Sequence, residues 1–339
     1  MEETTPPREP PPLPREPAPS VTARESRRAS IKMERLTKFY DHKLALDRLD
    51  LEIHAGDLFG YIGPNGAGKT TTLRILAALL LPSGGKVEIE GVDVVRHPRR
   101  IKELVGYMPD SFGVYENMTL YEYLDFFAAA YRIARGKRRP VIDGVLALTD
   151  LGPKRDDQVS VFSRGMKQRA CLAKTLLHDP RVLLLDEPAS GLDPRARIEL
   201  RELLKELQKM GKTIVVSSHI LTELSTICDT VGIIEAGRLV TAGRIDEILK
   251  NLRPHRQFTV TLLDASDSPR AASLIEKRNG IRKVDAEGTS IRVSIDAPDA
   301  EIAGLIGLLA AERIRLLGFR EETADLETAF LMLTQGKLA

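Results

Sequence analysis

A short glycine-rich stretch, GPNGAGKT at residues 63–70, constrains the fold of this chain more than any other feature. It fills every fixed position of the G-x-x-x-x-G-K-[ST] pattern. The short apolar run DLFGYI precedes it and the helix-forming run TTLRILAALLL follows it, so the order is strand, glycine loop, helix. In such a loop the backbone N–H groups face a phosphate at the positive end of the helix. The stretch therefore predicts an α/β fold with a phosphate-binding loop.

Each fixed position of this loop has a chemical reason. Gly63, Gly66 and Gly68 let the main chain approach a phosphate with no Cβ in the way. Lys69 is expected to neutralise the β- and γ-phosphates, and the Thr70 hydroxyl to hold Mg²⁺. The alternative is a glycine turn that binds nothing, but an interior lysine and threonine have no packing reason to follow such a turn.

A second apolar strand, LLLDEP at residues 183–188, ends in two acids. Its carboxyl end should lie beside the phosphate loop, so Asp186 is expected to steady the Mg²⁺ shell through water and Glu187 to act as general base. His219 follows the strand TIVVSS and should reach the same sheet edge, where it would contact the γ-phosphate. The alternatives are two acids that only close a strand and a histidine with a structural role.

The chain divides by composition into a tail and two folded parts. Residues 1–30 are rich in Pro, Glu, Arg and Ser and are expected to be disordered. Alternating strands around the glycine loop, a helical insert at about 114–180 and returning apolar strands predict one α/β domain over 31–250. A mixture of short strands and helices predicts a small α+β domain over 251–339.

Composition excludes several other classes of protein. The 339 residues carry a net charge of +2, which gives no reason to expect nucleic acid as a partner. The longest apolar runs, at 75–81 and 126–131, fall well short of the roughly 20 residues that span a bilayer. Cys171 and Cys228 lie in apolar segments, where small core residues are favoured over a disulfide, and this fits a reducing cytoplasm.

Four motifs together carry a family resemblance. GPNGAGKTT, FSRGMKQR, LLLDEPASGLD and SSH, in this order and spacing, resemble the nucleotide-binding ATPase subunit of an ATP-binding cassette (ABC) transporter over residues 31–250. The resemblance implies the P-loop ABC-ATPase fold, in which a mixed sheet core carries a helical subdomain. It also implies ATP and Mg²⁺ as cofactors.

The resemblance assigns roles to individual residues. It implies that Tyr40 stacks on adenine, the alternative being a core tyrosine. Catalysis is expected from Glu187 and His219, and metal binding from Thr70, Asp110 and Asp186. The residues expected to contact nucleotide are Tyr40, Gly63, Pro64, Asn65, Gly66, Ala67, Gly68, Lys69, Thr70, Thr71, Ser163, Arg164 and Gly165.

The signature segment FSRGMKQR explains why a second chain is expected. In the family, the residues here numbered Ser163 and Gly165 bind the γ-phosphate of the nucleotide held by the other subunit, so a homodimer would complete two sites. Two positions depart from the family's usual pattern. Arg164 could add charge at the phosphate or only reach solvent, and Asp110 stands where a glutamine is common, which leaves its role in coupling open.

These features predict the ATPase of an ABC exporter, a peripheral protein held at the inner face of the cell membrane by a separately encoded permease. The segment LETAFLMLTQG at 326–336 resembles the closing helix of type-2 exporter ATPases and favours export. The aromatic helix near Phe126 would be mainly core, in a region that forms the permease groove in the family. The basic run RGKRRP at 135–140 is expected to be a solvated loop, with lipid headgroup contact as the alternative. The alternatives for the whole chain are a soluble, non-transport cassette ATPase and a weakly hydrolysing nucleotide-dependent regulator.

Overall fold

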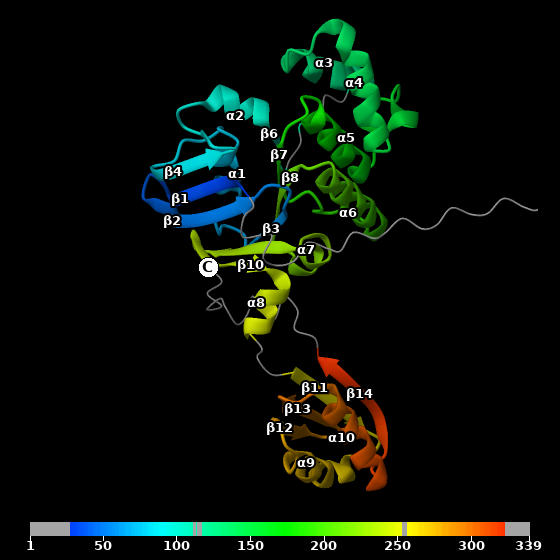
Figure 1. The fold of residues 1–339 in the computed structure, drawn as a ribbon. Coiled ribbons are helices and arrows are strands. Elements are labelled where there is room, and N and C mark those ends of the chain that lie inside the picture. Colours follow the sequence, from blue (N-terminus) through cyan, green and yellow to red (C-terminus); the bar gives the residue numbers. More distant parts are fainter. Residues whose placement is uncertain (1–27, 111–112, 114–116, 253–255, 323–339) are drawn as a thin grey trace, which may run out of the picture.

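A computed structural model describes residues 28–110, 113, 117–252 and 256–322 (Figure 1). The Pro-rich tail up to residue 27 and the segment at 326–336 lie outside the described residues, so the expectations for both stay predictions.

The N-terminal strands form an antiparallel sheet in the order β2-β1-β4-β5. Its two long strands alternate apolar and polar residues, and this period of two places one face on the core and the other in solvent. The bounds are β1 Ala29–Tyr40, β2 Lys43–His54, β4 Gly84–Ile89 and β5 Val92–Asp93. The strand β3, which comes between them in the sequence, belongs to another sheet.

The central sheet has the order β10-β9-β3-β8-β7-β6, and its strands are parallel except β10, which pairs antiparallel with β9. All residues of β3, β7 and β8 are buried, as expected of parallel strands covered on both faces. The bounds are β3 Leu58–Ile62, β6 Val105–Met108, β7 Val182–Asp186, β8 Thr213–Ser218, β9 Thr230–Glu235 and β10 Arg238–Arg244.

Two hydrophobic clusters cover the two faces of this sheet. Along β7, Leu183 and Leu185 join one cluster, while Val182 and Leu184 join the other, because successive side chains point to opposite faces. The first cluster includes buried residues of the helices α3 Leu120–Ala130, α4 Arg135–Leu148, α5 Arg164–Leu176 and α6 Pro194–Lys209. Helix α1, Lys69–Leu76, packs with β1 and β2 in the second cluster. The remaining helices of this part are α2 Pro98–Leu104, α7 Leu221–Ile227 and α8 Ile245–Leu252.

The prediction that RGKRRP at 135–140 is a solvated loop is wrong, because these residues form the beginning of α4. Apolar residues at helical spacing follow the basic run, and Ile142, Val145 and Leu146 are buried in the cluster below. This packing extends the helix back through Pro140, although a proline inside a helix removes one backbone hydrogen bond.

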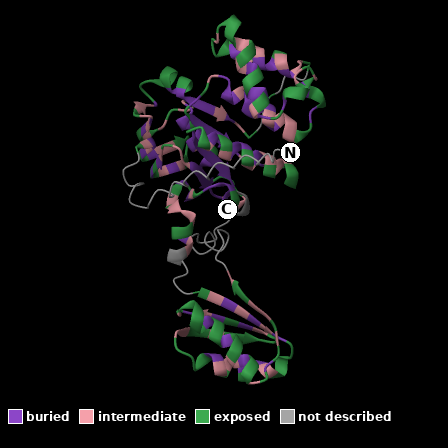
Figure 2. Cartoon of the chain, turned by 45° about the vertical axis from the view of Figure 1, so that its right-hand side comes forward, coloured by how far each residue is buried: buried purple, intermediate pink, exposed green. Residues whose placement is uncertain are grey.

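The C-terminal unit has the element order β-α-β-β-α-β and an antiparallel sheet in the order β12-β13-β11-β14. This is the split βαβ arrangement of ferredoxin-like domains. The strands bury alternate residues against α9 and α10, and this unit has its own hydrophobic cluster (Figure 2). Its bounds are β11 Arg256–Leu262, α9 Ser268–Glu276, β12 Ile281–Glu287, β13 Ser290–Ile295, α10 Asp299–Ala311 and β14 Leu316–Glu322. The predicted small α+β fold is confirmed.

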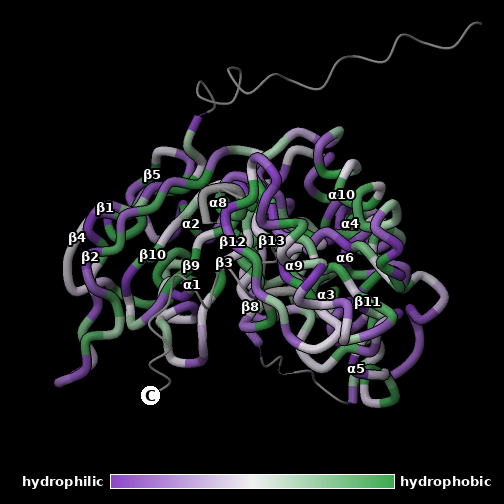
Figure 3. Tube along the Cα trace, turned by 90° about the horizontal axis from the view of Figure 1, so that it is seen from below, coloured by the Kyte–Doolittle hydropathy of each residue, from purple (hydrophilic) through white to green (hydrophobic). Residues whose placement is uncertain are grey.

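Within the described ranges, no helix is both long enough and apolar enough to cross a bilayer. Figure 3 shows hydrophilic and hydrophobic residues interspersed along the helices.

Candidate active site

The candidate site begins at the glycine loop between β3 and α1, where glycine is required for two different reasons. Gly66 and Gly68 have φ angles of 83° and 110°, in the left-handed region. A Cβ at Gly63 would lie 2.4 Å from the carbonyl oxygen of Ile234, and one at Gly68 would lie 2.9 Å from that of Ala45. The loop is therefore shaped by the neighbouring backbone of β2 and β9, and only glycine fits at these positions.

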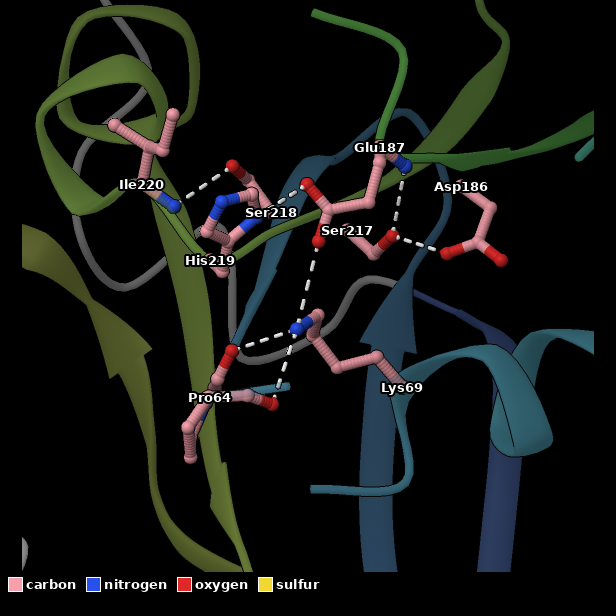
Figure 4. Close-up of polar contacts among 9 residues, drawn as sticks. Pro64, Lys69, Asp186, Glu187, Ser217, Ser218, His219 and Ile220 are labelled. Atoms are coloured by element: carbon pink, nitrogen blue, oxygen red, sulfur yellow. Dashed lines mark hydrogen bonds and ion pairs between the residues drawn. The ribbon is translucent and has the colours of Figure 1, made fainter. Parts of the chain in front are cut away.

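Lys69 is the first residue of α1, and its side chain turns back over the loop (Figure 4). Its Nζ donates to the carbonyl oxygens of Gly63 at 2.6 Å and Pro64 at 3.3 Å. It also lies 3.4 Å from Oε1 of Glu187. Burial lowers the pKa of Lys69, while the negative charges of Glu187 and Asp186 act in the opposite direction. The loop thus holds a buried amine among backbone carbonyls and one carboxylate.

Asp186 and Glu187 follow one another at the carboxyl end of β7, and Ser217 of β8 contacts both (Figure 4). The Ser217 hydroxyl donates to Oδ1 of Asp186 at 2.7 Å and accepts from the backbone N–H of Glu187 at 3.0 Å. Ser217 is fully buried and stands beside Asp186 in the parallel register. Sequence reasoning missed this residue, although the serine before SH in TIVVSSH, at the end of a neighbouring strand, was the available signal.

The carboxylate of Glu187 lies between two basic groups. His219 Nδ1 donates to Oε2 of Glu187 at 2.9 Å, and Lys69 faces the other oxygen. The backbone of Glu187 has a φ of 49°, a left-handed conformation that is uncommon outside glycine and that clusters at functional sites. The structure therefore brings Lys69, Asp186, Glu187 and His219 together at one sheet edge, as the motifs predicted.

The other residues of this segment differ in their exposure to solvent. Asn65 and Thr70 are exposed and Thr71 is half-buried, so their side chains can be reached from solvent. Ala67 is buried beneath the loop. Thr72, one residue further on, donates to the Gly68 carbonyl at 3.0 Å and ties the loop to the first turn of α1.

Among the described residues, no hydrogen bond or ion pair joins Tyr40 or Asp110 to this centre. Tyr40 ends β1 with 40% of its surface exposed, and the Nζ of Lys38 lies 5.1 Å from its ring. Asp110 is exposed just beyond β6. It is near enough to add to the raised pKa of Tyr107, which results first from burial and then from the charge of Asp186. Tyr107 therefore lies under the influence of both acids.

The signature segment caps helix α5. The Ser163 hydroxyl accepts from the backbone N–H of Met166 at 3.3 Å, as an N-cap does. The guanidinium of Arg164 lies against Gly191, where a Cβ would come within 2.4 Å of its Cζ. Gly165 is close to the start of α6, since a Cβ there would lie 3.2 Å from that of Ala196.

One further side chain links this helix to the acids. Gln168 is buried, and its Nε2 donates to the carbonyl of Pro188, which follows Glu187 directly. Sequence reasoning missed Gln168 because the amino-acid sequence does not show toward which neighbouring element a side chain on the second turn of a helix points. In the part of the chain that the structure describes, no hydrogen bond or ion pair joins Ser163, Arg164 or Gly165 to the glycine loop.

These residues fit a nucleoside triphosphate with its metal. The glycine loop leads into the N-terminus of α1, a kind of helix end that binds anions, and Lys69 supplies a cation there. The described residues contain no group of three or more His, Cys, Asp and Glu able to hold a metal by themselves. The Asp186 carboxylate at the end of β7 suits Mg²⁺, which takes one or two carboxylates and completes its shell with substrate phosphates and water. The fold and the site define a P-loop ATPase.

Comparisons with known proteins narrow this class. The family model described as ABC transporter matches residues 46–190. The Bacitracin transport ATP-binding protein BcrA of Bacillus licheniformis is 37% identical over 77% of this chain and 83% of its own. The Nod factor export ATP-binding protein I of Ralstonia nicotianae is 31% identical over 90% of this chain and 93% of its own. A solved ATP binding subunit of an ABC transporter is 29% identical, with a TM-score of 0.59, and the match covers 66% of this chain and 92% of that one.

The chain belongs to the family of ABC transporter ATP-binding proteins. It is an ATP-binding and ATP-hydrolysing subunit that serves transport, and the predicted fold and enzyme class are confirmed.

Proposed function

We propose that Gly63–Thr71 hold the phosphates of ATP, that Thr70 and Asp186 bind Mg²⁺, and that Glu187 is the general base. The contact of Glu187 with both Lys69 and His219 at the carboxyl ends of β3, β7 and β8 supports this proposal most directly. In these roles Lys69 neutralises phosphate charge and His219 contacts the γ-phosphate. Tyr40 stacks on adenine, and Asp110 approaches the metal from the loop after β6.

We further propose that two copies of the chain share each site. Ser163, Arg164 and Gly165 stand exposed or half-buried at the start of α5, without polar contact to their own glycine loop in the described structure. A helix N-terminus with free N–H groups attracts an anion. In a two-fold dimer this helix start meets the nucleotide bound by the partner subunit.

The proposed setting is the inner face of the cell membrane, under a separately encoded permease. Both curated relatives named above are described as acting in transport or export, which supports an exporter. The proposed cassette covers residues 31–250, its helical subdomain about 114–180, and the accessory domain 251–339. Neither relative's name supports a soluble, non-transport ATPase.

The test of the proposal is Glu187→Gln. This change keeps the size of the side chain and removes the base, so ATP binding should persist while hydrolysis falls about 10²- to 10⁴-fold. With ATP and Mg²⁺ the variant should elute from size-exclusion chromatography as a dimer. Lys69→Ala is the control, since it should lose ATP binding and elute as a monomer under the same conditions. A monomeric Glu187→Gln with ATP bound would contradict the shared site.

A further inference from the structure

The turn after α3 and the first residues of α4 carry a concentrated positive charge. Between Tyr131 and Pro140 the sequence RIARGKRR contains five basic residues and no acidic residue. We call Arg132, Arg135, Lys137, Arg138 and Arg139 the basic tip. All of them are exposed except Arg138, which is half-buried. The α3–α4 hairpin that presents them extends from the edge of the molecule (Figure 1).

Most of this charge is not balanced within the chain. Arg138 lies 3.5 Å from Asp125 and donates from Nε to the Ile133 carbonyl at 2.9 Å. Arg139 lies 3.9 Å from Asp143, which also pairs with Arg155 at 2.8 Å. For Arg132, Arg135 and Lys137, the described residues offer no ion-pair partner. Three flexible cations are therefore left facing solvent.

Local stability does not explain this charge. Helix α4 begins at Arg135 with no acidic residue in its first turn and no side-chain cap from Ala134. Positive charges oppose the dipole at a helix N-terminus. The neighbouring α3, by contrast, begins with a complete capping box between Thr119 and Glu122. A sequence that breaks such local rules without a gain in folding indicates a functional requirement at that place.

Two partly exposed aromatic side chains come shortly before the basic tip in the sequence. Phe126 on α3 is 46% exposed, and Tyr131 at the end of that helix is 37% exposed. The Tyr131 ring stacks on His178 with 4.2 Å between centroids, so it is held in place. Basic residues beside exposed aromatic rings are the combination that suits the headgroup layer of a bilayer.

We propose that the basic tip binds anionic lipid headgroups of the membrane that holds the permease. The inference rests on the proposed function for its setting, since only a subunit docked under a permease stands next to a bilayer. The charge and the position of the basic tip indicate anionic lipid as its ligand. Exposed cations on a protruding hairpin can contact an extended anionic surface such as a bilayer. The tip is thus a second, lipid-mediated attachment of the subunit to the membrane.

The experiment is flotation of the full chain, without a permease, on phosphatidylcholine vesicles with or without phosphatidylglycerol. The wild-type chain should float with the anionic vesicles, more weakly as salt is raised, and should not float with phosphatidylcholine alone. The combined change Arg132→Glu, Arg135→Glu and Lys137→Glu should weaken binding to the anionic vesicles by about a hundredfold.

A charge-matched control isolates the tip from net charge. Lys277→Glu, Arg278→Glu and Arg313→Glu change the same number of exposed cations in the C-terminal unit and should leave vesicle binding as in wild type. ATPase activity without vesicles checks the fold and the nucleotide site in every variant, separately from lipid binding. If that charge reversal impairs folding, the combined change Arg132→Gln, Arg135→Gln and Lys137→Gln takes its place. Equal flotation of tip and control variants, or equal binding to both kinds of vesicle, would overturn the proposal.

Discussion

Ser217 forms hydrogen bonds with both acidic residues of the candidate site, Asp186 and Glu187. Its hydroxyl holds Oδ1 of Asp186, and its oxygen accepts the N–H of Glu187, whose backbone is in the left-handed region. Residues that orient a metal ligand typically affect metal affinity or activity by 10- to 100-fold. We therefore regard Ser217 as a positioning residue that fixes one acid by its side chain and the other by its backbone.

Ser217→Ala should lower ATPase activity by about 10- to 100-fold and raise the Mg²⁺ concentration that gives half-maximal rate. The reason is that Asp186 loses the donor that orients it, while the buried N–H of Glu187 loses its acceptor. Mg²⁺ titration of the ATPase rate measures the shift, and nucleotide binding without Mg²⁺ should stay close to wild type.

The adjacent Ser218 provides a matched control. It is also buried, but its hydroxyl accepts from the N–H of Ile220 and does not contact either acid in the described structure. Ser218→Ala should leave the Mg²⁺ dependence unchanged. Coincident Mg²⁺ curves for Ser217→Ala and the wild type would refute the positioning role.

At the scale of elements, His178 lies just after α5 and contacts residues at the end of α3 and in β6. Its ring stacks on Tyr131, which follows α3, and its Nε2 lies 3.1 Å from the carbonyl of Val105 in β6. Its Nδ1 is buried with no hydrogen-bond partner among the described residues. Burial lowers the pKa of His178, helped by the charge of Lys212 and opposed by that of Asp179. The folded chain therefore holds a neutral imidazole here.

This contact should make stability depend on pH in one direction. In the unfolded chain His178 takes up a proton near its ordinary pKa of about 6.5, whereas the folded chain resists protonation. Its contribution is fully present above about pH 6.5 and is lost as the pH falls below it. His178→Gln, which can still donate to Val105, should show a smaller loss of Tm between about pH 7.5 and pH 5.5. Thermal unfolding of both forms measures this, and parallel Tm profiles would speak against it.

Elements with strong periodic patterns could be predicted from the sequence, whereas contacts between elements could not. GPNGAGKT, LLLDEP and TIVVSSH each mark a strand end, and parallel pairing brings such ends together, so the fold and the meeting of Lys69, Glu187 and His219 were predictable. The pairing of Arg164 with Gly191 depends on side-chain direction across two elements. RGKRRP was misassigned because buried residues further along α4 outweigh its local composition. The roles of the site residues stay predictions.

At the scale of the whole molecule, the chain contains separate hydrophobic cores. The cluster between the C-terminal sheet and helices α9 and α10 shares no residue with the two clusters that cover the central sheet. A unit with its own core can unfold by itself. The candidate active site lies wholly within the part that ends before β11.

Ile291→Ala should therefore destabilise only the C-terminal unit. Ile291 is fully buried in β13, and an isoleucine-to-alanine change in a core costs about 2–5 kcal/mol. Scanning calorimetry of the full chain should show two transitions, of which one moves to lower temperature. ATPase activity at about 25 °C should be unchanged, because no site residue contacts this core. A common shift of both transitions would show that the units unfold together.

The pairing of Lys69 with Glu187 has a consequence for the choice of anion at the glycine loop. Because the lysine already faces a carboxylate, the positive charge of the loop is partly balanced within the chain itself. A phosphate that pairs with Lys69 would exchange one anion for another, and Glu187 has His219 as its second partner. Small inorganic anions, which bring no adenine or metal to offset the loss of the internal pair, should compete poorly for the loop. The loop should therefore discriminate between ATP and small anions, and ATP would displace from Lys69 the carboxylate that we propose as the general base.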